Sequence, residues 1–224
     1  MSASQNKLSI SPDGESFPLP EQADYAAEYE RVKALAEAAR AKGQEVVVVM
    51  GVGFVGAVMA AIVADCTDRD GRPSKFVIGC QRPSTRSFWK IPLLNRGVSP
   101  VKAEDPQVDV LIGRCVNDRK TLTATYNSQV IDLADCVVID VQCDFLKQEL
   151  GNMKSGECDM AALEATLKTV GQHIRPECLV LIETTVAPGT TEFVAWPILK
   201  KAFANRGITS VPLLAHSYER VMPG

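Results

Sequence analysis

The sequence predicts an α/β fold built on a doubly wound, mostly parallel sheet with an added N-terminal helix. From residue 45 onwards, short aliphatic and β-branched runs alternate with helical segments, which is typical of parallel strands joined by crossover helices. The first run, residues 46–49, is four consecutive valines, and a Gly51-x-Gly53-x-x-Gly56 motif and a breaker-free apolar segment follow it directly. Strand, glycine turn and helix in this order are the dinucleotide-binding signature of the Rossmann fold.

Each glycine of the motif has a separate task. Gly51 allows a sharp turn, Gly53 lets a pyrophosphate approach the backbone, and Gly56 lets the helix lie close to the strand. The free N–H groups and the dipole at the start of the helix then face the phosphates. We therefore assign the whole motif to the cofactor: Gly51, Val52, Gly53, Phe54, Val55 and Gly56. The alternative, a tight turn that binds nothing, is disfavoured by the strand before the motif and the helix after it.

Composition restricts the possible classes of function. The 224 residues suffice for one large domain or two small ones, and the contents of 46% hydrophobic and 23% charged residues are ordinary for a globular protein. A net charge of −3 gives no reason to expect a nucleic acid or an anionic membrane as partner. No apolar run reaches the roughly 20 residues of a membrane helix, and residues 1–30 contain no apolar signal core, so we expect a cytoplasmic protein.

The cysteines favour free thiols over a disulfide framework or a metal site. There are seven of them, an odd number, and no two form a Cys-x-x-Cys pair. Several lie in apolar runs, so we expect reduced, mostly buried thiols and no bound metal.

The other elements follow in order along the chain. Residues 1–20 suit an extended arm, and residues 21–42 suit a helix that covers either a sheet edge or a partner subunit. We divide the chain into an N-terminal arm and helix (1–44) and a dinucleotide-binding domain (45–224). Further strands are predicted at 76–80, 121–125, 136–141, 179–182 and 211–215. Helices are predicted at 57–64, 84–95, 128–134, 161–174 and 190–203, the last kinked at Pro197, whereas 108–115 suits a strand or a helix.

The end of the second sheet strand bears on the choice between NAD and NADP. In the dinucleotide signature an Asp or Glu at this place accepts hydrogen bonds from the adenosine ribose. Here the position holds Gln81, followed by Arg82. A glutamine can bond a hydroxyl but does not repel a 2′-phosphate, and Arg82 could pair with one or remain a solvated surface residue. These residues therefore leave the choice between NAD and NADP open.

Six blocks of the sequence carry a resemblance to a known family. They begin with the glycine motif (51–56) and continue with Leu-Asn-Arg-Gly-Val-Ser-Pro (94–100), Leu-Thr-Ala-Thr (122–125) and Ala-Asp-Cys-Val-Val (134–138). The last two, Glu-Thr-Thr-Val-Ala-Pro-Gly-Thr-Thr (183–191) and Ser-Tyr-Glu-Arg-Val-Met-Pro-Gly (217–224), are the most specific. In this order they resemble the N-terminal NAD-binding domain of the UDP-glucose/GDP-mannose dehydrogenase family, the nucleotide-sugar 6-dehydrogenases. The resemblance also favours a helix over 108–115.

The resemblance implies a four-electron oxidation, in which the C6 alcohol of a UDP-sugar becomes a carboxylate and two NAD are consumed. Glu219 matches the family's general base for hydrolysis of a thioester intermediate, although it could also be a surface carboxylate before a turn. Cofactor contacts carried over from the family fall on Arg86 near the adenosine, on Val141, Gln142 and Cys143 near the nicotinamide, and on Thr184 and Thr185. Substrate contacts fall on Tyr218, where many relatives have proline, and on the backbone of Arg220, Val221 and Met222. Cys143 replaces a family threonine, and the two threonines could instead cap a strand end.

The family's catalytic cysteine, lysine and asparagine belong to a central helix and a second domain, and the sequence up to Gly224 contains neither. We therefore expect this chain to be the cofactor-binding part of a longer, homodimeric enzyme and to be inactive by itself. Two alternatives stay open. One is a stand-alone dinucleotide-binding module with a regulatory or structural role. The other is a different two-domain dehydrogenase, such as a hydroxyacid oxidoreductase, which shares the glycine motif but lacks the last two blocks.

Overall fold

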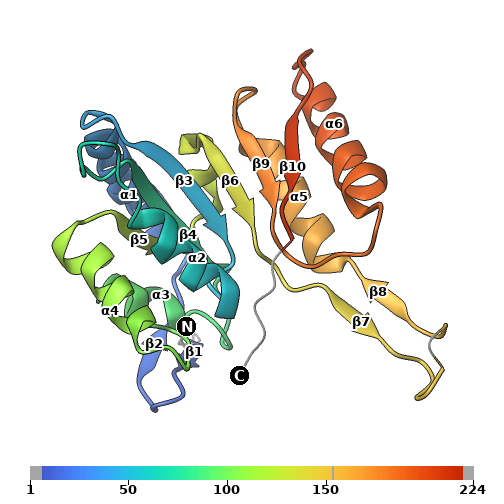
Figure 1. The fold of residues 1–224 in the computed structure, drawn as a ribbon, viewed down its shortest axis with the longest axis horizontal. Coiled ribbons are helices and arrows are strands. Elements are labelled where there is room, and N and C mark those ends of the chain that lie inside the picture. Colours follow the sequence, from blue (N-terminus) through green and yellow to red (C-terminus); the bar gives the residue numbers. More distant parts are fainter. Residues whose placement is uncertain (1–6, 153, 219–224) are drawn as a thin grey trace, which may run out of the picture.

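The fold is a six-stranded parallel sheet with helices on both faces, as the sequence predicts (Figure 1). The computed structural model describes residues 7–152 and 154–218. The sheet consists of β3 (Glu45–Met50), β4 (Lys75–Cys80), β5 (Leu122–Thr125), β6 (Cys136–Ile139), β9 (Leu179–Ile182) and β10 (Leu213–His216). Its order is β10-β9-β6-β3-β4-β5, so the chain runs outwards from β3 to one edge, returns to β6, and runs outwards to the other edge. The direction of winding therefore reverses between β3 and β6.

The strands are apolar on both faces because both faces are covered. In β3, Val46 and Val48 join one hydrophobic core, whereas Val47 and Val49 join the other. The second of these cores packs against α2 (Phe54–Ala64), α3 (Lys90–Asn95) and α4 (Gln107–Gly113). The first packs against α1 (Asp24–Arg40), η2 (Ser128–Leu133), α5 (Ala161–His173) and α6 (Trp196–Asn205). This double burial explains why four valines stand in a row.

The added helix α1 covers a face of the sheet, so the expectation that it covers a sheet edge is wrong. Its buried residues Val32, Ala36 and Ala39 belong to the same core as β3, β4 and β6. The reason lies in the crossover from β5 to β6, which contains only η2, a short 3₁₀ helix. That crossover is too short to cover this part of the face, and α1 covers it instead. Helix α1 also contacts the crossover, because the Tyr29 hydroxyl donates to Oδ2 of Asp132 in η2 at 2.8 Å.

Two antiparallel hairpins were not predicted. Within the arm expected over 1–20, residues 7–20 do not form a simple extended segment, because β1 (Leu8–Ile10) pairs with β2 (Ser16–Pro18) and buries Ser9 and Phe17. A second hairpin of β7 (Asp144–Leu146) and β8 (Glu157–Asp159) follows β6 and projects from the body of the molecule (Figure 1). Its strands are mostly exposed, so no buried alternating pattern marks them in the sequence.

Two predicted helices are interrupted at prolines. The helix expected over 84–95 is helical only at α3, because Pro92 has no N–H to donate to an earlier carbonyl and residues 84–89 form turns instead. The helix expected over 190–203 divides into a π-helical turn, η3 (Thr191–Ala195), and α6, with Pro197 in the first turn of α6. The ambiguous segment 108–115 is helical: α4 continues into η1 (Arg114–Asp118). Strand β6 ends at Ile139, so Asp140 and Val141 begin the following loop.

Candidate cofactor site

The glycine motif lies at the carboxyl edge of the sheet, where β3 and β6 run side by side. Doubly wound sheets bind ligands in the crevice at the point where the winding reverses, and this is that point. Gly51 has a φ of +103°, which glycine adopts readily and other residues do not. A Cβ on Gly51 would overlap the carbonyl oxygen of Asp140, so the turn requires glycine for its contact with the end of β6 as well.

The other two glycines of the motif differ sharply in their surroundings. A Cβ on Gly56 would overlap the carbonyl oxygen of Gly51 and lie 2.7 Å from Oδ2 of Asp140, so α2 starts in close contact with the turn. Gly53, by contrast, has no described atom within 4 Å of the position that its Cβ would take. Two glycines of the motif are therefore required by packing, and the middle one faces open space that a ligand could enter.

The start of α2 is suited to an anion. Gly53 is the residue before the first helical residue and supplies no side-chain cap, and the first turn contains no acidic side chain. The N–H groups of the first turn, at Phe54, Val55 and Gly56, have no carbonyl partner within the helix. The positive end of the helix dipole adds to these groups, so a phosphate bound at the start of α2 would be stabilised.

Gln81 is held against the glycine turn from the next strand. Its backbone N–H donates to the carbonyl of Thr125 (3.0 Å), and its side-chain Oε1 accepts a hydrogen bond from the N–H of Val52 (3.1 Å). The Val52 side chain is fully buried, and a Cβ on Gly79 would lie 2.6 Å from it. Val52 can therefore contact a cofactor only through its backbone, while Gln81 joins the ends of β3 and β4.

The segment that carries Arg82 and Arg86 is fixed by the N-terminal hairpin. The buried hydroxyl of Ser9 donates to the carbonyl of Thr85 (3.0 Å) and accepts from the N–H of Trp89 (3.1 Å). Both arginine side chains are exposed beside these anchored residues. Sequence reasoning missed Ser9, because nothing in the arm indicates a contact with a segment 76 residues away.

The loops after β6 and β9 meet at the same edge of the sheet. The N–H groups of Glu183 and Thr184 approach the carbonyl of Ile139 at 3.0 and 3.4 Å, which brings the predicted nicotinamide residues of both loops close together. Thr184 is buried and Thr185 is exposed. In the other loop Val141 is half-buried, and the exposed side chain of Gln142 donates to Oδ1 of Asp144 (2.6 Å).

The predicted substrate segment begins at this edge too. The N–H of Ser217 donates to the carbonyl of Ile182 (2.9 Å), so the chain leaves β10 beside the end of β9. The next residue, Tyr218, is 66% exposed. The predicted residues Glu219, Arg220, Val221 and Met222 lie outside the described residues.

In each cysteine whose pKa departs from its ordinary value, the pKa of the thiol is raised. Burial is the main cause throughout, and it raises the pKa of Cys80 and Cys178 to about 12. The pKa of Cys115, Cys136 and Cys143 is raised to about 11, and for Cys143 the neighbouring Cys158, Asp144 and Asp159 add to the effect of burial. These five thiols are therefore poor nucleophiles near neutral pH. All seven cysteines are free, and in the described part of the chain no three His, Cys, Asp or Glu residues are placed to hold a metal.

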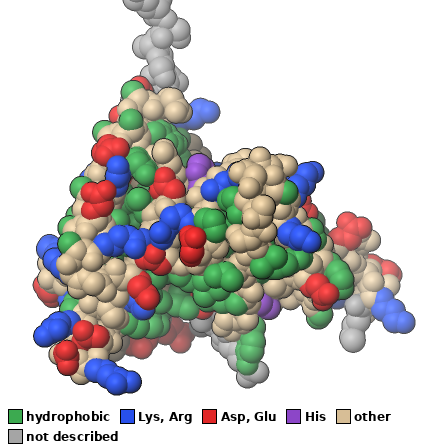
Figure 2. Space-filling model, turned by 90° about the horizontal axis from the view of Figure 1, so that it is seen from above, with side chains coloured by type: hydrophobic (Ala, Val, Ile, Leu, Met, Phe, Trp, Pro, Cys, Tyr) green, Lys and Arg blue, Asp and Glu red, His purple; other side chains and the backbone are tan. Residues whose placement is uncertain are grey.

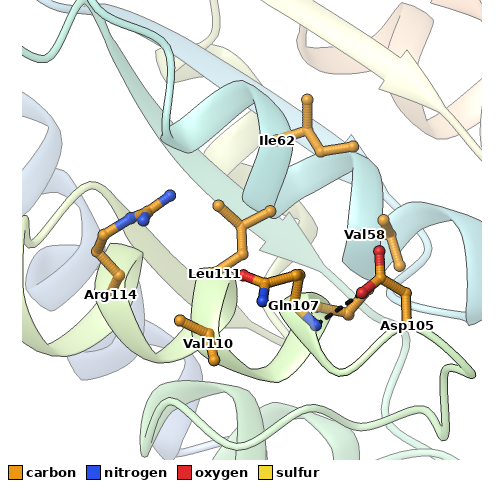
Figure 3. A pocket seen from close by; sticks show the side chains of 8 residues that line it. Val58, Ile62, Asp105, Gln107, Val110, Leu111 and Arg114 are labelled. Carbon is orange, nitrogen blue, oxygen red and sulfur yellow. Dashed lines mark hydrogen bonds between the residues drawn. The ribbon is translucent and has the colours of Figure 1, made fainter.

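Two pockets of the described chain lie away from the glycine motif. One, of about 220 Å³, lies between α2 and α4 and is lined by Ile62 of α2 and Leu111 of α4, among others (Figure 3). The other, of about 530 Å³, is lined by residues 97–99 and 101–103 and by Asp109. Neither is lined by a predicted site residue. On the face shown in Figure 2, Lys and Arg side chains are interspersed with Asp and Glu side chains. Among the described residues, no helix is long and apolar enough to cross a membrane.

Comparison with known proteins places this geometry in a family. Residues 45–224 match the model of the NAD binding domain of the UDP-glucose/GDP-mannose dehydrogenase family. GDP-mannose 6-dehydrogenase of Pseudomonas putida is 27% identical over 172 residues, which are 73% of this chain and 35% of that protein. Among solved structures, NDP-N-acetyl-D-galactosaminuronic acid dehydrogenase of Methanosarcina mazei is 34% identical with a TM-score of 0.68, over 84% of this chain and 37% of that one. UDP-D-ManNAc dehydrogenase of Pyrococcus horikoshii is 25% identical with a TM-score of 0.59, over 80% and 37%. The chain thus spans just over a third of the length of these relatives.

Proposed function

The chain belongs to the UDP-glucose/GDP-mannose dehydrogenase family, and on that premise we propose that it is the cofactor-binding part of a nucleotide-sugar 6-dehydrogenase. The reaction would oxidise the C6 alcohol of a UDP-sugar to a carboxylate. This removes four electrons, so two hydrides leave the substrate and two NAD accept them. The division into an N-terminal arm and helix (1–44) and a dinucleotide-binding domain (45–224) is part of the same proposal, as are a cytoplasmic location and a homodimer of the longer enzyme.

The observation that carries the proposal is the contrast among the three glycines. Gly51 and Gly56 are packed against each other and against Asp140, which holds the turn and α2 in a fixed relation to the sheet. Gly53 alone faces open space, directly before the uncapped first turn of α2. A turn that served only to connect strand and helix would not need an unobstructed side at Gly53. A pyrophosphate bound to the helix N-terminus does need it.

The proposed roles of the surrounding residues follow from which strand end they occupy. The adenosine half of the cofactor lies at the end of β4, with Gln81, Arg82 and Arg86. The nicotinamide half lies where the loops after β6 and β9 meet, with Val141, Gln142, Cys143, Thr184 and Thr185. The sugar nucleotide contacts the segment after β10, with Tyr218, Arg220, Val221 and Met222, and Glu219 activates the water that hydrolyses a thioester.

We further propose that the chain by itself binds NAD without turning over a substrate. Thioester chemistry needs a positioned thiolate. Burial raises the pKa of Cys143, the thiol of the proposed nicotinamide loop, to about 11, so it stays protonated near neutral pH. A nucleophile from another part of a longer enzyme would have to complete the site.

Titration calorimetry with NAD tests the cofactor proposal through Gly53→Val. The valine side chain would fill the open space beside the turn, so we expect loss of NAD binding with little change in thermal unfolding. The control is Gly113→Ala on α4, where the added Cβ would meet only the Gly97 carbonyl at an ordinary 3.6 Å. Unchanged NAD affinity in a folded Gly53→Val variant would refute the proposed site. Steady reduction of NAD with a UDP-sugar by this chain alone would refute its inactivity.

A further inference from the structure

The amide of Gln81 is oriented by the glycine turn. Its Oε1 is occupied by the N–H of Val52 at 3.1 Å, and because that partner is a donor, the oxygen must be the atom that faces it. The other end of the amide, Nε2, lies 3.5 Å from the hydroxyl of Ser87. Gln81 therefore offers N–H donors at the end of β4, where a carboxylate would offer acceptors. A donor suits a phosphate, whereas the two hydroxyls of a ribose are bonded best by acceptors.

The charges that follow Gln81 are all positive. No Asp or Glu occurs between Lys75 and Lys102, and Arg82, Arg86 and Lys90 fall within this stretch. In the described part of the chain neither Arg82 nor Arg86 forms an ion pair, and both are exposed. The two guanidinium groups are thus available to a ligand.

Two acidic side chains of neighbouring elements are already paired, and a third, Asp24 of α1, accepts a hydrogen bond from the N–H of Glu21. Glu28 of α1 bonds the Thr125 hydroxyl at 2.6 Å and pairs with Arg31 at 2.8 Å. Glu15 of the N-terminal hairpin pairs with Arg96 at 2.7 Å. None of these three carboxylates forms an ion pair with Arg82 or Arg86.

The backbone that carries both arginines is held in place before any ligand arrives. The Ser87 hydroxyl donates to the carbonyl of Arg82 (3.2 Å), and the indole N–H of Trp89 donates to the carbonyl of Arg86 (2.9 Å). Ser9 of the hairpin fixes Thr85 between them. Binding therefore needs to order only the two side chains, which lowers its entropic cost.

From these contacts we propose that the site accepts a 2′-phosphate on the adenosine ribose and binds NADP more tightly than NAD. This rests on the proposed function, because it concerns the adenosine half of the same dinucleotide site. The 2′-hydroxyl of NAD can still accept a hydrogen bond from Gln81, so both dinucleotides bind. The phosphate of NADP takes the same bond and adds charge-assisted hydrogen bonds to Arg82 and Arg86. Because the arginines are exposed, we expect an advantage of about tenfold, which shrinks as salt is added.

Titration calorimetry of the whole chain with NAD and with NADP tests this proposal. The unmodified chain should bind NADP about tenfold more tightly. The double variant Arg82→Ala/Arg86→Ala should lose that advantage, so that its affinity for NADP falls to about its affinity for NAD. Arg69→Ala, an exposed arginine of the loop before β4, should leave the ratio of the two affinities unchanged.

Gln81→Glu separates the amide from the arginines. The variant keeps the acceptor for the Val52 N–H and turns a carboxylate oxygen outwards where the amide was, so the preference should reverse to NAD. Tight binding of NAD with weaker or equal binding of NADP by the unmodified chain would overturn this inference alone. An unchanged ratio in the double variant would also overturn it. If neither dinucleotide binds, the proposed function fails and this inference with it.

Discussion

Asp135 joins three separate parts of the fold, and its replacement by alanine should destabilise the protein strongly. The residue directly precedes β6. Its Oδ2 accepts a hydrogen bond from the N–H of Val46 (2.8 Å), and its Oδ1 accepts bonds from Arg40 at the end of α1 (3.0 Å) and from Arg175 before β9 (2.6 Å). One carboxylate thus connects β3 with the end of α1 and with the segment before β9.

The magnitude follows from what each partner loses in Asp135→Ala. The N–H of Val46, a fully buried residue, would lose its acceptor, which costs about 1–3 kcal/mol. The two arginines are partly exposed and keep bonds to the carbonyls of Leu133 and Ala134, so each ion pair contributes only about 0–1 kcal/mol. We expect a total loss of roughly 2–4 kcal/mol in the free energy of unfolding. Asp135→Asn keeps an acceptor for Val46 and should lose less.

The stability that the Asp135 carboxylate contributes should decrease as the pH is lowered. Burial acts to raise the pKa of Asp135, but the hydrogen bonds from Val46, Arg40 and Arg175 outweigh it and leave the pKa below its ordinary value. A lowered pKa in the folded state contributes stability that is complete above the unfolded-state value of about 3.9. That stability is lost as the pH falls through the lowered value. The difference between wild type and Asp135→Asn should therefore be largest near neutral pH and smaller towards about pH 3.

Urea unfolding followed by circular dichroism, at neutral and at acid pH, measures both effects. Wild type, Asp135→Asn and Asp135→Ala should rank in that order of stability near neutral pH, and the differences should narrow on acidification. If Asp135→Ala unfolds within about 0.5 kcal/mol of wild type, the assigned contacts do not stabilise the fold. If the gap between wild type and Asp135→Asn is the same at both pH values, the carboxylate charge contributes nothing.

Three further changes probe the site. Gly56→Ala should lower stability by about 1–3 kcal/mol in thermal unfolding, because the overlap of the new Cβ with Gly51 costs more than the gain in helix propensity. Gly53→Ala should leave stability unchanged, because its Cβ would meet open space. Equal melting temperatures of the two variants would refute the packing argument. Ser9→Ala should lower the free energy of unfolding by about 1–3 kcal/mol and weaken dinucleotide binding on the adenosine side. The control is Ser11→Ala, whose hydroxyl accepts a bond within the hairpin and which should weaken binding less. Similar dinucleotide affinities of both variants would show that the hairpin does not position the site. In a longer, active enzyme, Glu219→Gln should slow thioester hydrolysis about 10²–10⁴-fold, and mass spectrometry should detect an accumulated covalent adduct; equal slowing of both hydride transfers without an adduct would contradict a general-base role.

Local patterns predicted most of the sheet and the edge of it at which the proposed site residues lie. A run such as residues 46–49 indicates burial of both faces of its strand. Successive side chains point to opposite faces, and all of them are apolar here because both faces are covered. The glycine motif likewise reports a local requirement, which the structure confirms at Gly51 through its positive φ. The ends of parallel strands share one edge by construction, so the loops after β4, β6 and β9 could be assigned to one site before their contacts were known.

Contacts between distant segments could not be derived in this way. The sequence determined the type and order of the sheet strands, the glycine turn and the family, because each depends on neighbouring residues or on a spaced motif. Only the tertiary structure decided that α1 covers a face left open by the short crossover η2, and that Ser9 anchors the segment around Thr85. It also decided which atom of Gln81 faces Val52, and hence which atoms of that amide are left for a ligand. The physical reason is that a residue pattern records how its own backbone is buried, whereas a partner far along the chain is chosen by which surfaces and hydrogen-bonding groups the rest of the fold leaves uncovered.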